Sequence, residues 1–391
     1  MCDYYLPGFR AGGPIQSLSG LVSALGETFD FRIITRNRDL ATKALYSETN
    51  SAAAASTRVG NAEVTYLPRR ALTLRGLRLA LRASPHQVLY LNSFFSPQFT
   101  IKPLILRKLR LVARNPVVVL APRGEFSPAA LALSRRKKRA FIACARIFGL
   151  YRGAIWQAST IDEGRLICQV MGARLKIRVA EVIVAGDVAE IRIAGLATRR
   201  PKAPGQLRIV MVSRITPMKN QLAALNMLGQ VRGRVTFDLF GPIDDPTYMA
   251  KVREAMRRLP PNVEANYRGE LPHDEVATKI GDYDLFLLPT LGENYGHIIR
   301  EALSAGCPVL VSDRTPWHGL SEAGAGWDLP LETPAEFVDR LHLCVRMIES
   351  EHKLMREAAV AYAREFLERD PSLKQNRELF LGAIAMYRRR R

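Results

Sequence analysis

Short apolar runs alternate with amphipathic stretches along most of this chain. Each run is rich in apolar or β-branched residues and has the length of a buried strand. The stretches between the runs show helical periodicity, and this alternation is typical of parallel sheets wound by right-handed crossovers. The predicted strands lie at residues 31–35, 88–92, 117–121, 155–158, 208–213, 235–240, 285–289 and 308–312.

The chain divides at residues 196–206, a stretch that contains two prolines, a glycine and several basic residues. This composition is typical of a linker, and 391 residues exceed what one hydrophobic core usually serves. We therefore predict an α/β protein with two Rossmann-like, doubly wound domains, residues 1–195 and 207–370, facing each other across a cleft. Residues 371–391 are predicted to form a C-terminal helix that packs back toward the first domain.

Charge is distributed unevenly along the chain. Residues 1–200 contain 31 Lys and Arg against 12 Asp and Glu, a net charge of +19, whereas residues 201–391 contain 26 against 25, a net charge of +1. A strongly basic half beside a neutral half indicates that the two halves meet different partners.

Basic residues of the first half concentrate at residues 69–82, 102–114 and 135–139. The first two segments interleave cations with leucines at near-helical spacing, so one face of each would be apolar and the other cationic. This fits docking on an anionic membrane surface, where each nearby cation contributes about 1 kcal/mol. It also fits surface helices whose leucines enter the core. Because the charge asymmetry favours the first interpretation, we expect an anionic membrane surface and a lipid-linked acceptor as partners.

The sequence indicates a cytoplasmic location. No apolar run reaches the roughly 18 residues that a membrane-spanning helix needs, since Arg146 interrupts the best stretch, residues 140–151. Residues 1–10 lack the basic and apolar blocks of a secretion signal, and the five cysteines have no paired spacing. We expect reduced thiols and peripheral association with the inner face of the membrane.

The second half carries its polar chemistry directly after the apolar run 285–289. Glu293 opens a short loop, residues 294–296, and a predicted helix that contains Glu301 follows. The first N–H groups of a helix lack partners and carry partial positive charge, so they can bind an anion. Glu301 lies about one turn into the helix. The pattern predicts a pocket for a sugar and a diphosphate, with one carboxylate on the sugar and the other on ribose hydroxyls.

Two cations lie in the connection after the run 208–213. Arg214 and Lys219 are five residues apart, between a predicted strand and a predicted helix. A guanidinium offers a planar fork and an ammonium a point charge, so the pair can neutralise charge on a leaving phosphate without a metal. The simpler interpretation is two solvated surface cations; the nearby Glu293 loop favours the diphosphate.

A glycine pair, Gly12–Gly13, precedes a helix predicted to begin near Pro14. Its bare backbone can approach a phosphate closely. A glycine pair is more often a plain turn, and the third glycine of a dinucleotide fingerprint is absent here.

Together these motifs resemble the retaining, nucleotide-sugar-dependent glycosyltransferases of the GT-B fold, family four (glycosyl transferases group 1), and within them bacterial members that build cell-surface polysaccharide. The similarity covers nearly the whole chain and is strongest over residues 208–331. The matching positions are Gly12–Gly13, residues 123–127, the basic residues 136–138, Arg214 to Lys219, Glu293 to Glu301 with Ala302, Gly306, Pro308 and Val309, and residues 315–317 and 326–327.

The resemblance implies a role for each charged residue of the second half. Arg214 and Lys219 would hold the donor diphosphate, Glu293 would contact the transferred sugar, and Glu301 would bind the ribose hydroxyls. The family implies transfer with retention by same-face attack, from a nucleotide-diphosphate sugar to a saccharide acceptor, with no metal or other cofactor. The two glutamates are then not the acid and nucleophile of a glycosidase.

Backbone groups would complete the donor site. Closure of the cleft would bring the glycine pair of the first domain to the phosphate. The resemblance implies donor binding, besides Glu301, by Gly12, Gly13, Asn294, Tyr295, Gly296 and His297.

The sequence departs from the family pattern in three places. Only residues 1–5 precede the glycine loop, so truncation of the first strand is an open alternative. The histidine that many relatives place near the sugar is missing from the matching segment; Arg123 occupies the corresponding place and joins the predicted catalytic residues. Asn294 replaces the more usual glycine, although asparagine tolerates left-handed backbone better than most residues.

Two other functions stay open at this point. A nucleic-acid-binding protein would also explain the basic half, although no zinc-finger, helix-turn-helix or aromatic RNA-binding signature is present and no nucleic acid is expected. A sugar-nucleotide epimerase shares the two-domain plan. A metal site is not expected, because the six histidines show no recognised ligand spacing.

Overall fold

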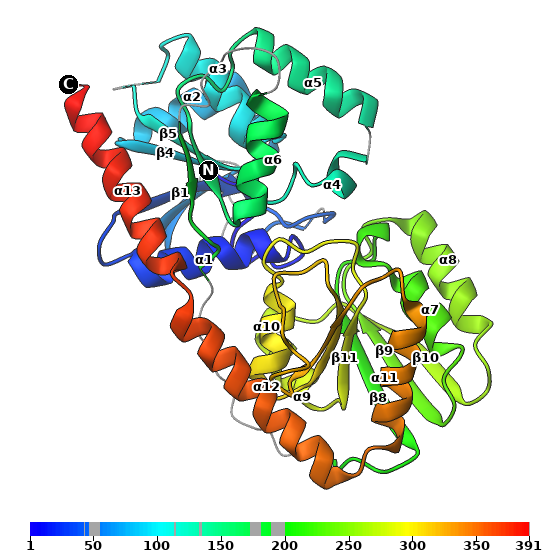
Figure 1. The fold of residues 1–391 in the computed structure, drawn as a ribbon. Coiled ribbons are helices and arrows are strands. Elements are labelled where there is room, and N and C mark those ends of the chain that lie inside the picture. Colours follow the sequence, from blue (N-terminus) through cyan, green and yellow to red (C-terminus); the bar gives the residue numbers. More distant parts are fainter. Residues whose placement is uncertain are drawn as a thin grey trace. The chain divides into compact units, whose positions relative to one another are not determined.

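The computed structural model describes residues 1–42, 44–46, 55–112, 115–132, 135–172, 181–188 and 200–390. The chain forms two compact α/β units, drawn as ribbons in Figure 1: unit 1 is Met1–Glu190 with Pro371–Arg391, and unit 2 is Ile191–Asp370. Of the predicted linker, residues 196–199 lie outside the described residues.

Unit 1 contains two sheets. One has the strand order β1-β3-β2 and the other β4-β5-β6-β7, and the pairings are parallel except that of β2 with β3. The elements are α1 (Gly13–Leu25), β1 (Phe31–Arg36), β2 (Ala55–Val59), β3 (Ala62–Leu67), α2 (Leu74–Ala83), β4 (Val88–Asn92), α3 (Lys102–Lys108), β5 (Val117–Ala121), α4 (Pro128–Ala132), α5 (Arg135–Ile147), β6 (Ile155–Ala158), α6 (Ile161–Gly172), β7 (Glu181–Val184) and α13 (Ser372–Arg389).

Residues 1 and 2 lie between these two sheets. The backbone N–H of Cys2 donates to Ile34 O of β1 at 3.3 Å, and Asn92 N of β4 donates to Met1 O at 3.1 Å. This short backbone segment therefore hydrogen-bonds to both sheets, directly before the glycine loop.

Helix α13 packs on β4 and β5 of unit 1. Leu379, Ala383 and Tyr387 form an apolar cluster with Val117 and Val119 of β5. The last helix of the chain thus supplies part of the core of unit 1, because β5 is buried along its whole length and needs an apolar partner on each face.

Unit 2 contains one parallel sheet with the strand order β10-β9-β8-β11-β12-β13. Its elements are β8 (Gln206–Val212), α7 (Gln221–Leu228), β9 (Arg234–Phe240), α8 (Pro246–Arg257), β10 (Val263–Gly269), α9 (His273–Gly281), β11 (Leu285–Leu288), α10 (His297–Ser304), β12 (Val309–Ser312), β13 (Gly326–Leu329), α11 (Pro334–Arg346) and α12 (Glu349–Arg369).

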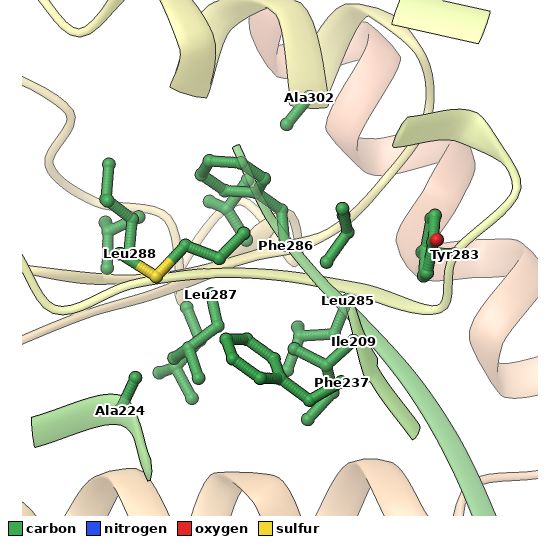
Figure 2. Close-up of a cluster of buried hydrophobic side chains, with 14 of the residues drawn as sticks. Ile209, Ala224, Phe237, Tyr283, Leu285, Phe286, Leu287, Leu288 and Ala302 are labelled. Carbon is green, nitrogen blue, oxygen red and sulfur yellow. The ribbon is translucent and has the colours of Figure 1, made fainter. Parts of the chain in front are cut away.

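The core of unit 2 surrounds β11, whose four residues are all fully buried. Figure 2 shows Phe286 pointing toward Ala302 of α10, while Leu287 lies on the other face of the strand with Phe237 and Ala224. Because helices cover both faces, replacing Phe286 by Ala would cost about 3–5 kcal/mol. This packing makes β11 a rigid base for the loop that carries Glu293.

Each predicted apolar run is a strand in the structure, and the α/β fold with two Rossmann-like units is confirmed. The runs did not predict β2, β3, β7, β10 or β13.

Candidate active site

The candidate site lies at the ends of two neighbouring strands of unit 2. β8 and β11 pair in the middle of the sheet, and the chain proceeds outward from β8 to β9 and β10 on one side and from β11 to β12 and β13 on the other. Because strand order reverses between β8 and β11, the connections after them run in opposite directions and leave room outside the strand ends. Open α/β sheets bind their ligands at this place.

Hydrogen bonds join the loops that follow β8 and β11. The carbonyl oxygen of Met218 accepts from Leu291 N at 2.9 Å and from Thr290 Oγ1 at 3.1 Å. Asn220 adopts left-handed backbone at φ 60° and donates through Nδ2 to Pro289 O at 2.9 Å. The turn Pro217–Lys219 is thereby fixed against the Glu293 loop.

Lys219 and Glu293 form an ion pair across these two loops. Their side chains are only 14% and 12% exposed. The backbone N–H of Glu293 donates to Arg314 O at 2.9 Å, which ties the loop to the segment after β12. The structure therefore brings together one predicted phosphate ligand and the predicted sugar ligand.

Arg214 has a different partner. Its guanidinium lies 2.7 Å from Asp244 Oδ2, in the loop after β9, and remains partly exposed. The backbones of these loops also pair, since Ile215 N donates to Pro242 O at 2.8 Å. Arg214 and Lys219 thus project from one connection, and each contacts its own carboxylate.

Helix α10 begins at a glycine that the fold requires. Gly296 adopts φ 77°, and a Cβ there would lie 2.9 Å from Trp317 Nε1. Trp317 Nε1 donates to Tyr295 O at 2.7 Å, and the Tyr295 ring packs against Phe366 and His297. Burial, with the Asp370 carboxylate nearby, raises the pKa of Tyr295. The Tyr295 side chain is therefore an anchor in the core, and its carbonyl oxygen is engaged by Trp317.

The remaining predicted donor residues follow in the same loop and helix. Glu301 is buried, with its Oε1 4.0 Å from Nδ1 of His273, the first residue of α9. His297 is buried beside Tyr295, and Asn294 is half-buried. Glu301 thus contacts α9, whereas Glu293 contacts the turn that carries Lys219.

The glycine pair lies in unit 1, at the start of α1. Gly12 has φ 66° and precedes the helix, which begins at Gly13. Within the described part of the chain, no atom outside its two chain neighbours lies within 4 Å of the position that a Cβ of Gly12 would take. The backbone is open at this turn, and its approach to a phosphate stays a prediction.

Arg123 also lies in unit 1, where its guanidinium is buried. It forms an ion pair with Asp187 and donates to Tyr90 Oη at 2.7 Å and to Asn92 Oδ1 at 3.0 Å. These contacts hold the ends of β4 and β5 together. The Arg123 guanidinium thus binds three side chains, and its catalytic role stays a prediction.

Sequence reasoning did not single out Asp244 or His273. Asp244 closely follows β9, the strand that neighbours β8, and an acid at that place in the chain is the signal that could have identified it. Among the residues that the structure describes, no group of three or more His, Cys, Asp and Glu is arranged to hold a metal ion.

Comparisons with known proteins give one match to a segment of unit 2 and several matches to the fold of the chain. Residues 206–346 match the family model of glycosyl transferases group 1. A search of curated proteins gives no match.

Solved structures match over almost the whole chain. HepE of Anabaena, crystallised with UDP and glucose, is 15% identical with a TM-score of 0.66, and the match covers 98% of this chain and 99% of HepE. An α,α-trehalose-phosphate synthase (UDP-forming) of Burkholderia vietnamiensis is 13% identical with a TM-score of 0.68, covering 98% and 97% of the two chains. Sucrose-phosphate synthase of Thermosynechococcus elongatus is 14% identical with a TM-score of 0.67, covering 96% and 94%.

The structural matches establish the fold. This chain has the GT-B fold, and its residues 206–346 match the family model of glycosyl transferases group 1.

Proposed function

We propose that this chain is a retaining glycosyltransferase that transfers a sugar from a nucleotide-diphosphate sugar to a saccharide acceptor without a metal ion. The observation that carries the proposal is the Lys219–Glu293 ion pair, held where strand order reverses in the sheet of unit 2. A glycosyl phosphate presents hydroxyls beside an anion, so a carboxylate and a cation held close together can bind both parts of it.

Each residue then has a defined role. The donor diphosphate binds Lys219 and Arg214 and replaces their carboxylate partners, Glu293 and Asp244. Glu293 then accepts a hydrogen bond from a hydroxyl of the transferred sugar. As the bond from the anomeric carbon to the phosphate oxygen breaks, the two cations neutralise the leaving diphosphate. The acceptor hydroxyl attacks from the same face and gives its proton to the leaving phosphate. The N–H groups at the start of α10 add partial positive charge.

We propose a UDP-sugar as the donor. HepE was crystallised with UDP and with UDP-glucose, and the trehalose-phosphate synthase is UDP-forming. In this proposal Glu301, buried beside His273, accepts hydrogen bonds from the ribose hydroxyls.

We also propose a lipid-linked saccharide acceptor in cell-surface polysaccharide synthesis, with the enzyme cytoplasmic and bound peripherally to the inner face of the membrane. The support is the net charge of +19 over residues 1–200. The helices in the described part of the chain include none long and apolar enough to cross a membrane.

Donor binding and turnover test the core of this proposal. UDP-, GDP- and ADP-sugars are compared by the thermal stabilisation that they produce, since a ligand that binds only the native state raises its stability. Lys219→Ala and Glu293→Gln are each expected to lower kcat/KM by about 10²–10³-fold. The control is Lys279→Ala, which removes an exposed lysine of α9 that pairs with Asp282 at 3.9 Å.

Two outcomes would contradict the proposal. Near-normal turnover in both site variants would remove the mechanism, and donor conversion without any acceptor would indicate an epimerase instead. The anomeric configuration of the product, read from its proton spectrum, tests retention separately.

A further inference from the structure

The middle of unit 1 is almost free of acidic residues. Residues 64–161 contain 18 Lys and Arg and a single acid, Glu125. Glu125 lies inside the unit, where it accepts hydrogen bonds from Ser93 Oγ at 2.7 Å and Phe95 N at 3.2 Å, and burial raises its pKa. The cations of this region therefore have no surface carboxylate from the same stretch of chain to neutralise them.

Within this region, the ends of α3 and α5 lie side by side and expose apolar side chains. Lys108 Nζ contacts Phe148 O, and Arg107 Nη1 donates to Arg152 O at 3.5 Å. Figure 1 shows both helices at one end of unit 1. Three apolar side chains there are largely exposed: Leu109 at 60%, Ile147 at 71% and Phe148 at 67%. Arg107, Lys108, Leu109, Ile147, Phe148 and Arg152 are called the α3–α5 patch below.

The C-terminal end of α13 adds charge to this patch. The pKa of Arg107 is lowered by burial and by the positive charge of Arg390. Arg388 and Arg389 precede Arg390, and all three are exposed. Arg390 thus lies near Arg107 of the patch, directly after two further exposed arginines.

Helix α2 shows why these exposed residues differ from ordinary helix surface. Its leucines divide: Leu77 and Leu81 are buried in the core, as expected for a surface helix, whereas Leu74 and Leu79 are exposed. At the α3–α5 patch, by contrast, two large neighbours in sequence, Ile147 and Phe148, are both exposed and flanked by cations. Exposed apolar side chains within a basic surface are what an interfacial membrane anchor presents.

We propose that the α3–α5 patch is the surface by which this protein docks on an anionic lipid bilayer, with Ile147 and Phe148 entering the interfacial region and the surrounding cations on lipid phosphates. The inference rests on the proposed lipid-linked acceptor and names the surface that would bring the enzyme to it. A nucleic acid would satisfy the cations, but it offers no apolar medium for Ile147 and Phe148.

Vesicle binding tests the proposal, by co-sedimentation of the full chain with phosphatidylcholine vesicles that contain or lack phosphatidylglycerol. Ile147→Ser with Phe148→Ser is expected to lower the partition coefficient on anionic vesicles about tenfold or more. Arg388→Gln with Arg389→Gln is expected to lower it about tenfold at low salt and much less at high salt.

Matched controls separate the patch from general effects. Ile161→Ser removes an isoleucine of α6 that is 64% exposed, and Arg257→Gln with Arg258→Gln removes the same charge from unit 2. Both controls are expected to bind vesicles as the unmodified protein does.

Three results would overturn the proposal: no preference for anionic vesicles, equal loss in Ile161→Ser, or duplex DNA binding that needs Arg388 and Arg389 but not Ile147 and Phe148. The last result would assign the surface to nucleic acid.

Donor stabilisation and turnover of a water-soluble acceptor are expected to be unchanged in all these variants. If the unmodified protein shows neither donor stabilisation nor turnover, the proposed function is rejected, and the vesicle result still stands by itself.

Discussion

At the scale of residues, the site is electrically balanced before any donor arrives. Lys219 contacts Glu293 and Arg214 contacts Asp244, so each predicted phosphate ligand already has a carboxylate partner. A diphosphate must therefore replace these carboxylates, and the free energy of binding is reduced by whatever each pair contributes. For a partly exposed pair such as Arg214–Asp244 this is about 0–1 kcal/mol.

Replacing Asp244 by Asn is thus expected to strengthen donor binding. Arg214 loses its competing carboxylate, and the KM for the donor should fall about two- to fivefold while kcat stays within twofold. The control is Asp245→Asn, which also removes one negative charge, at the next residue in the chain. Asp245 caps α8 by accepting from Tyr248 N at 2.9 Å, and asparagine caps helices equally well. An equal fall in KM in both variants would mean a general effect of charge, and no fall in either would mean that Asp244 does not compete.

The residue scale also shows what the sequence could predict. Arg214 and Lys219 occur within one connection, and the nearby Glu293 loop is what favours a diphosphate site over two solvated cations. The partner of Arg214 was not predicted, because Asp244 reaches it through the pairing of the loops after β8 and β9. The catalytic role of Arg123 stays a prediction, and its three partners, which come from β4 and from residue 187, lie far from it in sequence.

At the scale of elements, the start of α10 depends on one glycine. Gly296 has left-handed backbone, and the Trp317 indole occupies the space that a side chain would need. Trp317 in turn stacks on Phe366 of α12 at 4.2 Å between ring centroids. The N–H groups at the start of α10 are thereby held in place by the contacts of Trp317.

Gly296→Ala is expected to destabilise unit 2 by about 1–3 kcal/mol and to weaken donor binding, because the loop must move to relieve the contact with Trp317. Gly292→Ala in the same loop is the control, because its Cβ position has no atom of the described residues within 4 Å apart from those of its chain neighbours. Urea unfolding followed by tryptophan fluorescence measures the first effect, and calorimetry with a UDP-sugar measures the second. If the two variants are equally stable, the role assigned to Gly296 is wrong.

Some strands could be predicted from the sequence, whereas others could not. The runs at β4, β5, β8 and β11 were predicted because strands covered on both faces need continuous apolar residues. β10 was missed because this edge strand, VEANYRG, is only half-buried and resembles a polar stretch. β13 is another edge strand, only four residues long, and its register comes from its pairing with β12. These two edge strands are defined by their neighbours more than by their own composition.

At the scale of the whole molecule, the chain returns to unit 1 for its last helix. α12 belongs to unit 2, the chain passes Asp370, and α13 packs on the sheet of unit 1. The buried side chain of Asn376 fixes this helix: its Nδ2 donates to Gly186 O at 2.8 Å, and its Oδ1 accepts from Gln157 Nε2 at 3.0 Å. The sequence predicted a terminal helix, but the asparagine within it gave no sign of this contact.

Asn376→Ala is therefore expected to destabilise unit 1 and leave unit 2 unchanged. The substitution leaves the Gln157 donor and the Gly186 carbonyl buried with one partner fewer, which costs about 1–3 kcal/mol for each unsatisfied group. Lys374→Ala, at an exposed position of the same helix, is the control. Hydrogen exchange followed separately in β5 and β11 measures the two units, since each opens with its own free energy. Faster exchange in β5 alone would show that α13 stabilises unit 1 through Asn376; equal acceleration in β11 would show that the two units unfold together, and unchanged exchange in both would show that Asn376 contributes little.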